Sequence, residues 1–485
     1  MNEKRNQKIR TRFAPSPTGN PESIHLGFVI RALWNYAYAK KNDGQFVLRI
    51  EDTDRKRSRK DTEEVILRVL KGFRILWDEG PDIGGPHAPY RQSERLEIYQ
   101  KAAHQLVERG YAYYDFDAAV REKEEIKEAY QSKDKLAELK IRPKARLADA
   151  KEAKKRVESG ESYVVRVKIP EDRTFDYEDW ILKKRVKFLG KEVPDLILLK
   201  SDGFPTYHLA VVVDDIDMEI SHVFRGQEWI SSTPIHLYIY EGLKHDIPTI
   251  GHFSVILDPR TSKKFSKRDM TALFGANTWL SKGYLPEAIL NYLMLLGWAP
   301  KDNREMFTLE EFVETFDRDG IQKANPTFDV NKLDWFNQQY MQKKSEEDFV
   351  TYVGDMSVYK ERPNFSNIVL KTASFMPSRI KNIDDYDKMI GFFFDMPKVD
   401  EGLLGKNYKS HLQAAKEVFE SLGEWSLREM NDKLMDSVKK NNFKTGDFFM
   451  DLRIAITGNK FTPPINDSIL ILGREETLRR LKKVT

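Results

Sequence analysis

The sequence predicts an α/β protein in which a doubly wound parallel sheet is followed by a separate helical domain. The first observation is a strand–helix–strand pattern at the N-terminus: a short strand at residues 12–14, a helical apolar pattern from His25 to Lys41, and a near-continuous apolar strand from Gln45 to Ile50. Such a βαβ unit is the first half of a nucleotide-binding doubly wound sheet. The second observation is that long β-branched runs are missing after about residue 320.

The segments between and after these elements fit the same architecture. Pro15 and Pro17 stiffen the loop after the first strand, and Gly44 stands where the first helix should end. The highly charged stretch at residues 118–160 predicts exposed helices in an insertion rather than core sheet.

Further strands are predicted in the middle of the chain. Tyr163 to Val167 alternates as a strand does, and the apolar block from Leu196 to Leu199 precedes a turn at residues 201–203. Tyr207 to Val213 is predicted to be a buried strand that ends at Asp214-Asp215. The C-terminal part is divided into helix-length pieces by Pro363, Pro377, Pro397, Gly423 and Pro463-Pro464.

Composition narrows the functional classes. A chain of 485 residues exceeds one hydrophobic core, so two or more domains are expected. The chain has no cysteine, which excludes disulfides and thiolate metal sites, and no structural zinc is expected. No secretory signal or membrane-length apolar run is visible, so a soluble cytoplasmic protein without a membrane partner is expected. The 80 basic and 76 acidic residues nearly balance, so net charge alone does not indicate nucleic-acid binding.

Two short motifs are candidates for phosphate chemistry. His25-Leu26-Gly27 lies at the start of the first helix, where free N–H groups suit a phosphate, Gly27 lets a nucleobase approach the backbone, and His25 can donate to phosphate oxygens. Lys264-Phe265-Ser266-Lys267-Arg268 concentrates positive charge in a loop that could close over a triphosphate. Taken alone, the first motif is equally typical of a packed helix start. The second motif, taken alone, is more typical of an exposed basic loop than of a phosphate site.

Both motifs in this order, with a βαβ unit at the first, resemble the signatures of class I aminoacyl-tRNA synthetases. Within that class the chain is similar to glutamyl-tRNA synthetases over nearly its whole length. The similar segments are RFAPSPTG at 12–19, LRIEDTDR at 48–55, GPHAPYRQSERLEIYQ at 85–100, KSDGFPTYHLAVVVDD at 200–215, HVFRGQEWISSTPIHLYIYE at 222–241, KKFSKRD at 263–269, FDVNKLDWFNQQY at 328–340, LRIAITG at 452–458 and ILGREETLRRL at 471–481.

The resemblance implies an architecture. It implies a Rossmann-type catalytic domain, an inserted acceptor-binding subdomain, a stem-contact region that carries the lysine loop, and an all-helical anticodon-binding domain. The expected bounds are 1–100 with 205–255 for the catalytic domain, 101–204 for the insertion, 256–320 for the stem-contact region and 321–485 for the helical domain.

The resemblance also implies site residues. Arg12 and Arg225 are expected to bind glutamate, and a bidentate guanidinium suits its carboxylate. The remaining expected roles are Ser16, Glu51 and Tyr207 at the α-ammonium and α-carboxylate, His25, Gly27, Lys264 and Lys267 at the nucleotide, and Glu228 and Trp229 as a wall of the ATP site. No metal ligand set is expected.

The implied reaction is the ATP-dependent activation of L-glutamate to glutamyl-adenylate, followed by transfer to a ribose hydroxyl of the terminal adenosine of tRNA. The implied partners are ATP with Mg²⁺ as its substrate complex, glutamate, and tRNA contacted at its acceptor end and anticodon arm. A monomer is expected. Whether tRNA-Gln is charged as well as tRNA-Glu, and which residues read the anticodon, stay open.

Three positions depart from the family pattern. Residues 22–24 look inserted before His25, so the loop must bulge. Val211 stands where many relatives have an asparagine that helps to hold the substrate, and valine offers no hydrogen bond. Asp115 and Asp117 stand where some relatives have zinc-binding cysteines. The first two departures favour one alternative, a catalytically weak tRNA-binding paralogue. Another alternative, within the enzyme class, is a glutaminyl-tRNA synthetase.

Overall fold

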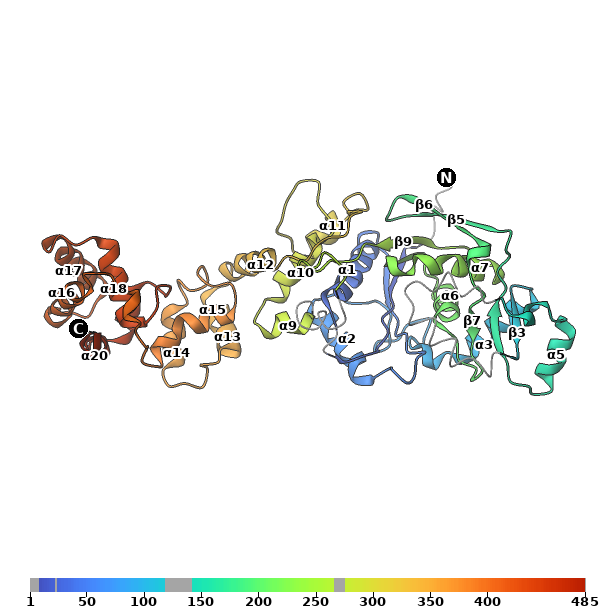
Figure 1. Cartoon of the computed structure of the whole chain (residues 1–485), viewed down its shortest axis with the longest axis horizontal. Helices are drawn as coiled ribbons and strands as arrows, with labels where there is room; N and C mark the ends of the chain where they lie inside the picture. Colours follow the sequence, from blue (N-terminus) through green and yellow to red (C-terminus); the bar gives the residue numbers. More distant parts are fainter. Residues whose placement is uncertain (1–7, 22–23, 118–141, 266–274, 485) are drawn as a thin grey trace. The chain divides into compact units, whose positions relative to one another are not determined.

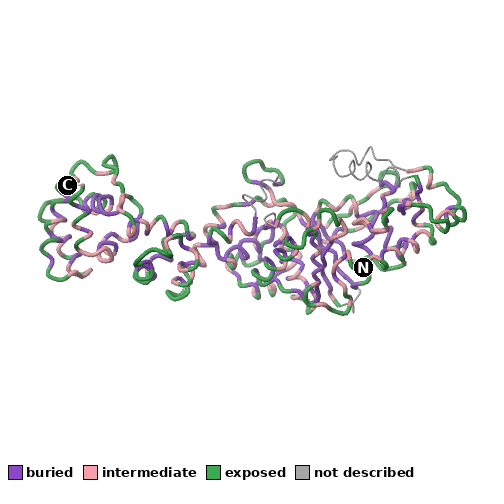
Figure 2. The backbone as a smooth tube through the Cα atoms, turned by 90° about the horizontal axis from the view of Figure 1, so that it is seen from below, coloured by how far each residue is buried: buried purple, intermediate pink, exposed green. Residues whose placement is uncertain are grey.

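The computed structural model describes residues 8–21, 24–117, 142–265 and 275–484. The chain forms two compact units, one of residues 1–278 with 290–329 and the other of residues 279–289 with 330–485. Figure 1 shows the strands in the first unit and a succession of helices in the second. Figure 2 shows that each unit has buried backbone in its interior and exposed residues around it.

The first unit is built on a four-stranded parallel sheet. Its strand order is β2-β1-β8-β9, from β1 (Arg10–Phe13), β2 (Gln45–Leu48), β8 (His222–Gly226) and β9 (Thr249–Phe253). All three neighbouring pairs are parallel, and α1 (Leu26–Lys41) connects β1 to its neighbour β2. The predicted βαβ unit and parallel sheet are confirmed.

Local chemistry defines the ends of α1. His25 is the N-cap residue, and its Nδ1 accepts a hydrogen bond from the N–H of Phe28 at 3.2 Å. At the other end, the N–H of Gly44 donates to the carbonyl of Ala39 at 2.8 Å. A Cβ at Gly44 would lie 2.3 Å from the carbonyl oxygen of Ile9, so only glycine fits where the chain turns into β2.

Helices and a second sheet complete the first unit. The antiparallel sheet β3-β4-β7 consists of Ala112–Asp115, Val164–Val167 and Ile197–Leu199, and β5 (Thr174–Asp179) pairs with β6 (Lys184–Leu189) in a hairpin. The strands predicted near residues 163–167 and 196–199 are confirmed. The other helices are α2 (Lys60–Gly72), α3 (Leu96–Glu108), α5 (Ala150–Glu158), α6 (Tyr207–Asp217), α7 (Thr233–Gly242) and α11 (Leu309–Thr315).

The charged stretch at 118–160 is only partly described. In α5 the single buried residue is Ala153, as expected for an exposed helix. Residues 118–141 lie outside the described residues.

The strand predicted from Tyr207 to Val213 is wrong: these residues begin α6. Residues 209–215 are all buried, and the helix packs against α3, α7 and β7. A helix that is buried on all sides shows the same short apolar run as a central strand, so periodicity cannot separate the two.

The second unit confirms the predicted helical C-terminal part. Its helices from residue 330 onward are α12 (Val330–Gln342), α13 (Glu346–Met356), α14 (Phe365–Thr372), α15 (Ile383–Ile390), α16 (Tyr408–Ser421), α17 (Leu427–Lys440), α18 (Thr445–Thr457), α19 (Ile465–Leu472) and α20 (Arg474–Val484). No strand occurs within 330–484, and each of the predicted proline and glycine breaks lies between helices. Two further helices, α9 (Ala276–Ser281) and α10 (Pro286–Leu295), include the remaining residues of this unit.

Leu412, Phe419, Leu434, Phe448 and Leu452 belong to one hydrophobic core of the second unit and are fully buried. Among the described residues, no helix is long and apolar enough to cross a bilayer.

Candidate active site

A cavity of about 400 Å³ lies at the carboxyl ends of β1 and β8, beside the start of α1. This edge of a parallel sheet is where doubly wound folds bind their ligands. The cavity is lined by eight of the residues predicted from the sequence, namely Arg12, Ser16, His25, Glu51, Tyr207, Arg225, Glu228 and Trp229. Residues that are more than 200 positions apart in the chain are thus brought to one site.

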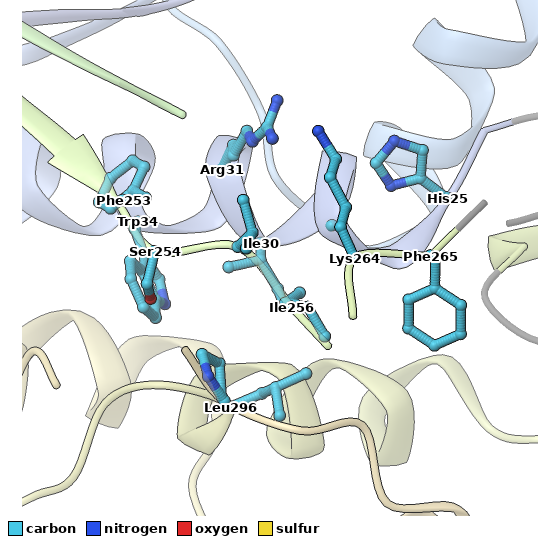
Figure 3. A pocket seen from close by; sticks show the side chains of 13 residues that line it. His25, Ile30, Arg31, Trp34, Phe253, Ser254, Ile256, Lys264, Phe265 and Leu296 are labelled. Atoms are coloured by element: carbon cyan, nitrogen blue, oxygen red, sulfur yellow. The ribbon is translucent and has the colours of Figure 1, made fainter. Parts of the chain in front are cut away.

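A second, smaller cavity of about 40 Å³ adjoins the helix start (Figure 3). His25 and Arg31 line both cavities, and Gly27 and Lys264 line the smaller one. Figure 3 shows the side chains of His25, Arg31 and Lys264 above α1. The predicted phosphate-binding residues are therefore neighbours, except for Lys267, which lies outside the described residues.

Arg12 is buried and forms part of an ion-pair network at the base of the cavity. Its Nε lies 3.1 Å from Asp215, whose Oδ1 also accepts a hydrogen bond from Nη1 of Arg49 at 2.8 Å. Burial raises the pKa of Asp215, but Arg12 and Arg49 outweigh it and hold that pKa below its ordinary value. The sequence showed the pair Asp214-Asp215 but gave no reason to place either acid at the site.

Glu51 is a buried acid that lines the larger cavity. Nη2 of Arg49 lies 3.2 Å from its Oε1. Burial raises the pKa of Glu51 to about 7, although Arg49 and Arg12 oppose the shift. A bound ammonium group would favour the carboxylate form, so Glu51 is suited to bind a cation and release a proton.

Tyr207 and Trp229 form an aromatic wall of the cavity. Their ring centroids are 4.1 Å apart at an interplanar angle of 31°. Burial raises the pKa of Tyr207 to about 12, so it remains a phenol that can donate a hydrogen bond. Trp229 lies in the short helix η5 (Gln227–Ser232), directly after the end of β8.

Glu228 also lies in η5 and pairs with Arg31 of α1 at 2.9 Å. A Cβ at Gly226 would lie 2.1 Å from its Oε2, so the glycine lets this carboxylate fold back over the backbone. Arg31 is a residue of the site that the sequence reasoning missed.

His25 is held neutral at the start of α1. Burial, with Arg31 and Lys264 adding to it, lowers its pKa to about 3. Because Nδ1 accepts from the N–H of Phe28, the proton of the neutral ring is on Nε2, which is a donor suited to a phosphate oxygen.

Arg225 is held differently from Arg12. Its donors contact His252 Nε2 at 3.1 Å, His236 Nδ1 at 2.8 Å and Thr233 Oγ1 at 2.9 Å. Sequence reasoning missed these three partners, because no local pattern connects them to Arg225.

Two of the positions that depart from the family pattern can also be placed, whereas residues 22 and 23 lie outside the described residues. Val211 is buried and lines a cavity of about 10 Å³ together with Arg225. Asp115 is buried and pairs with Arg166 at 2.8 Å. Among the described residues, no group of three or more histidines and acids is arranged to hold a metal ion.

Comparison with known proteins agrees with this fold. The profile of the family "tRNA synthetases class I (E and Q), catalytic domain" matches residues 8–335, and that of the family "Anticodon binding domain" matches residues 334–485. Together with the parallel sheet and the helical second unit, these matches define the class: a class I aminoacyl-tRNA synthetase with a catalytic and an anticodon-binding part.

Relatives within this class narrow the assignment. The glutamate–tRNA ligase of Thermus thermophilus is 36% identical, covering 98% of this chain and 99% of its own, and that of Acinetobacter baumannii is 36% identical, covering 98% and 93%. The crystal structure of a glutamate tRNA ligase from Elizabethkingia meningosepticum in complex with its amino acid matches with a TM-score of 0.85 at 33% identity, over 98% and 99% of the two chains. The chain belongs to the glutamate–tRNA ligase family.

Proposed function

We propose that this protein charges tRNA with glutamate in two steps, first forming glutamyl-adenylate from glutamate and ATP and then transferring the glutamyl group to the terminal adenosine. The observation that carries the proposal is the composition of the larger cavity. It is lined by two buried arginines, Arg12 and Arg225, and one buried acid, Glu51, and it lies beside the start of α1. Two cationic groups and one anionic group complement an amino acid with an additional carboxylate.

Glutamate binding is assigned to the residues of the larger cavity. Arg225 and Arg12 bind its side-chain carboxylate, and Glu51 binds its ammonium group. Ser16 and Tyr207 complete the binding of its α-carboxylate and ammonium by hydrogen bonds. Since Arg12 is already paired with Asp215, Arg225 supplies the larger part of the charge recognition.

ATP binding is assigned to the helix start and the basic loop. The N-terminus of α1 suits phosphate groups, and His25 and Lys264 contribute a hydrogen-bond donor and a positive charge. Gly27 leaves room for the nucleoside, Glu228 and Trp229 form a wall of the site, and Lys267 joins Lys264 in the phosphate loop. ATP enters as its Mg²⁺ complex, and the metal adds charge compensation at the phosphates.

No protein nucleophile is required for this reaction. The α-carboxylate of glutamate attacks the α-phosphorus and pyrophosphate leaves; the 2′-hydroxyl of the tRNA then attacks the acyl carbon and AMP leaves. The protein orients the reactants and stabilises the negative charge that develops on the phosphate.

The tRNA-binding part of the proposal follows the expected domains. Residues 101–204 contact the acceptor end, residues 256–320 the stem, and the helical residues 321–485 the anticodon arm. The absence of strands from 330–484 does not favour the glutaminyl-tRNA synthetase alternative, whose C-terminal region would be a β-barrel. Because charged tRNA is used by ribosomes, we propose that the enzyme acts in the cytoplasm. We also propose that it is a monomer.

ATP–pyrophosphate exchange tests the function directly. The purified chain should exchange pyrophosphate in the presence of glutamate, and we expect exchange to require tRNA. Equal exchange with and without tRNA would refute the tRNA requirement, and no exchange in either case would favour a catalytically weak tRNA-binding paralogue. Charging of purified tRNA-Glu and tRNA-Gln in parallel then shows how many tRNAs are substrates.

A further inference from the structure

The guanidinium of Arg225 is held on three sides by neutral groups. His236, His252 and Thr233 accept hydrogen bonds from it at 2.8 to 3.1 Å, and all three are buried. The carbonyl oxygen of Trp229 accepts a fourth hydrogen bond at 3.3 Å. Within the described part of the chain, no carboxylate lies within ion-pair distance of Arg225. The guanidinium is therefore fixed in place while its charge stays uncompensated.

The hydrogen bonds determine where the imidazole protons are. A guanidinium only donates, so Nδ1 of His236 and Nε2 of His252 must both be acceptors. The proton of His236 is therefore on Nε2, 3.2 Å from Nδ1 of His208, and the proton of His252 is on Nδ1, 2.6 Å from Asp179. The nearest acid in this chain of contacts is thus separated from Arg225 by an imidazole ring.

Both rings remain neutral in this arrangement. Burial, and then Arg225, lower the pKa of His236 well below its ordinary value. Burial and Arg225 also lower the pKa of His252, although Asp179 opposes the shift. A proton added to either acceptor atom would place an N–H group against a guanidinium N–H, which both geometry and charge disfavour.

Arg12, which lines the same cavity, provides the contrast. Its charge is compensated by Asp215 at 3.1 Å. A buried cation without a counterion is costly, and a ligand that brings a carboxylate removes that cost. An amide oxygen can accept a hydrogen bond from Arg225, but it leaves the positive charge without a counterion.

We propose that His236 and His252 are positioning residues that fix the Arg225 guanidinium without neutralising it, and that this arrangement makes the site select a side-chain carboxylate over a side-chain amide. The inference rests on the proposed function, because it concerns the amino-acid substrate of that reaction. It assigns to two buried histidines the discrimination between glutamate and glutamine.

The decisive comparison is between His236→Asp and His236→Asn, two variants of nearly equal size. Asparagine keeps a neutral acceptor near the position of Nδ1, whereas aspartate places an anion beside Arg225. Both variants lose some activity, because neither side chain reproduces the imidazole ring. KM and kcat are measured for glutamate and for glutamine by ATP–pyrophosphate exchange with tRNA present.

We expect His236→Asn to keep the glutamate-to-glutamine ratio of kcat/KM within about threefold of the unmodified protein. His236→Asp should lower that ratio by about tenfold or more, mainly by raising KM for glutamate while kcat changes less. If His236 had only a structural role, the two substitutions would change this ratio of kcat/KM equally. Equal ratios in the two variants would therefore overturn the inference.

A second pair keeps the test decisive if His236→Asp fails to fold, as judged by its thermal unfolding. His252→Gln and His252→Glu reach the position of Nε2 with a neutral and a charged acceptor, and the same ordering is expected. Exchange by the unmodified protein distinguishes a failure of the proposed function from a failure of the role assigned to the histidines. No exchange with glutamate would contradict the proposed function itself, whereas normal exchange with equal ratios in both variants of a pair would contradict only the role of the histidines.

Discussion

The two arginines that line the larger cavity are held in different ways, which define a charged side around Arg12 and a neutral side around Arg225. On one side, Arg12 and the fully buried Arg49 are paired with Asp215 in a network of charges. On the other side, Arg225 is hydrogen-bonded to His236 and His252, which carry no charge. Breaking a buried ion pair is strongly destabilising, whereas a fixed uncompensated charge is available to a ligand. We therefore propose that the charged side mainly stabilises the fold, although Arg12 also contacts glutamate, and that Arg225 on the neutral side supplies the larger part of the charge recognition.

The largest expected effect concerns the charged side. Arg49→Met removes a side chain that pairs with Asp215 at 2.8 Å, Glu51 at 3.2 Å and Asp214 at 3.4 Å. The variant should lose about 3–5 kcal/mol of unfolding free energy, because buried acids are left without their partner. Denaturant unfolding measures this loss.

The matched control is Arg91→Met, which removes a partly exposed arginine paired with Glu63. Its loss should be about 1 kcal/mol or less. Equal losses in Arg49→Met and Arg91→Met would contradict the structural role of the buried network.

The second effect concerns the neutral side. Arg225→Gln should reduce kcat/KM for glutamate by about 100- to 1000-fold, because the side-chain carboxylate loses its cationic partner. Its unfolding free energy should fall by only about 1–2 kcal/mol, the cost of imperfectly satisfied imidazole acceptors. Exchange kinetics and denaturant unfolding of the same preparation separate the two quantities. A loss of unfolding free energy as large as that of Arg49→Met would contradict the claim that Arg225 contributes mainly to substrate binding.

A third, intermediate effect is a pH dependence that comes from Glu51. Since its pKa in the empty site is about 7, the carboxyl is mostly protonated below that pH and must lose its proton before it binds an ammonium group. KM for glutamate should therefore rise about tenfold from pH 8 to pH 6 and level off at higher pH. In Glu51→Gln the affinity should be lower and this pH dependence absent. An unchanged pH profile in that variant would show that another group titrates.

The smallest effect is expected at Val211. The adjoining cavity of about 10 Å³ is also lined by Tyr240, whose buried hydroxyl has no hydrogen-bond partner. Val211→Asn supplies an amide beside Arg225 and should lower KM for glutamate by about two- to fivefold, the value of one added hydrogen bond. Val211→Ala is the control, since it changes volume without adding a polar group. An equal change of KM in the two variants would exclude a hydrogen-bonding role.

Local patterns predicted the parts of the fold that depend on local chemistry. The βαβ unit followed from the periodicity of residues 25–41 and the apolar run that begins at Gln45. The segment that begins at Tyr207 was predicted wrongly as a strand, because complete burial removes the polar face by which a helix is recognised. Breaks at prolines between the C-terminal helices were predicted correctly, since proline disrupts a helix through its own geometry.

The residues of the candidate site show the same difference between what local sequence predicts and what depends on the folded structure. Arg12 and Arg225 were assigned through motifs that resemble a known family, and they line one cavity. Asp215, His236 and His252 were not assigned, because their roles depend on contacts made only after folding. A buried histidine in a sequence carries no local sign that its partner is an arginine 11 or 27 positions away.

The most direct test of the account is a crystal structure of this chain with glutamate and a non-reactive ATP analogue. The account predicts the side-chain carboxylate within hydrogen-bonding distance of Arg225, the ammonium group at Glu51, and the α-carboxylate directed toward His25 and the α-phosphate. A glutamate bound in the opposite direction, with its side chain at Glu51 or outside the cavity that Arg12 and Arg225 share, would contradict it.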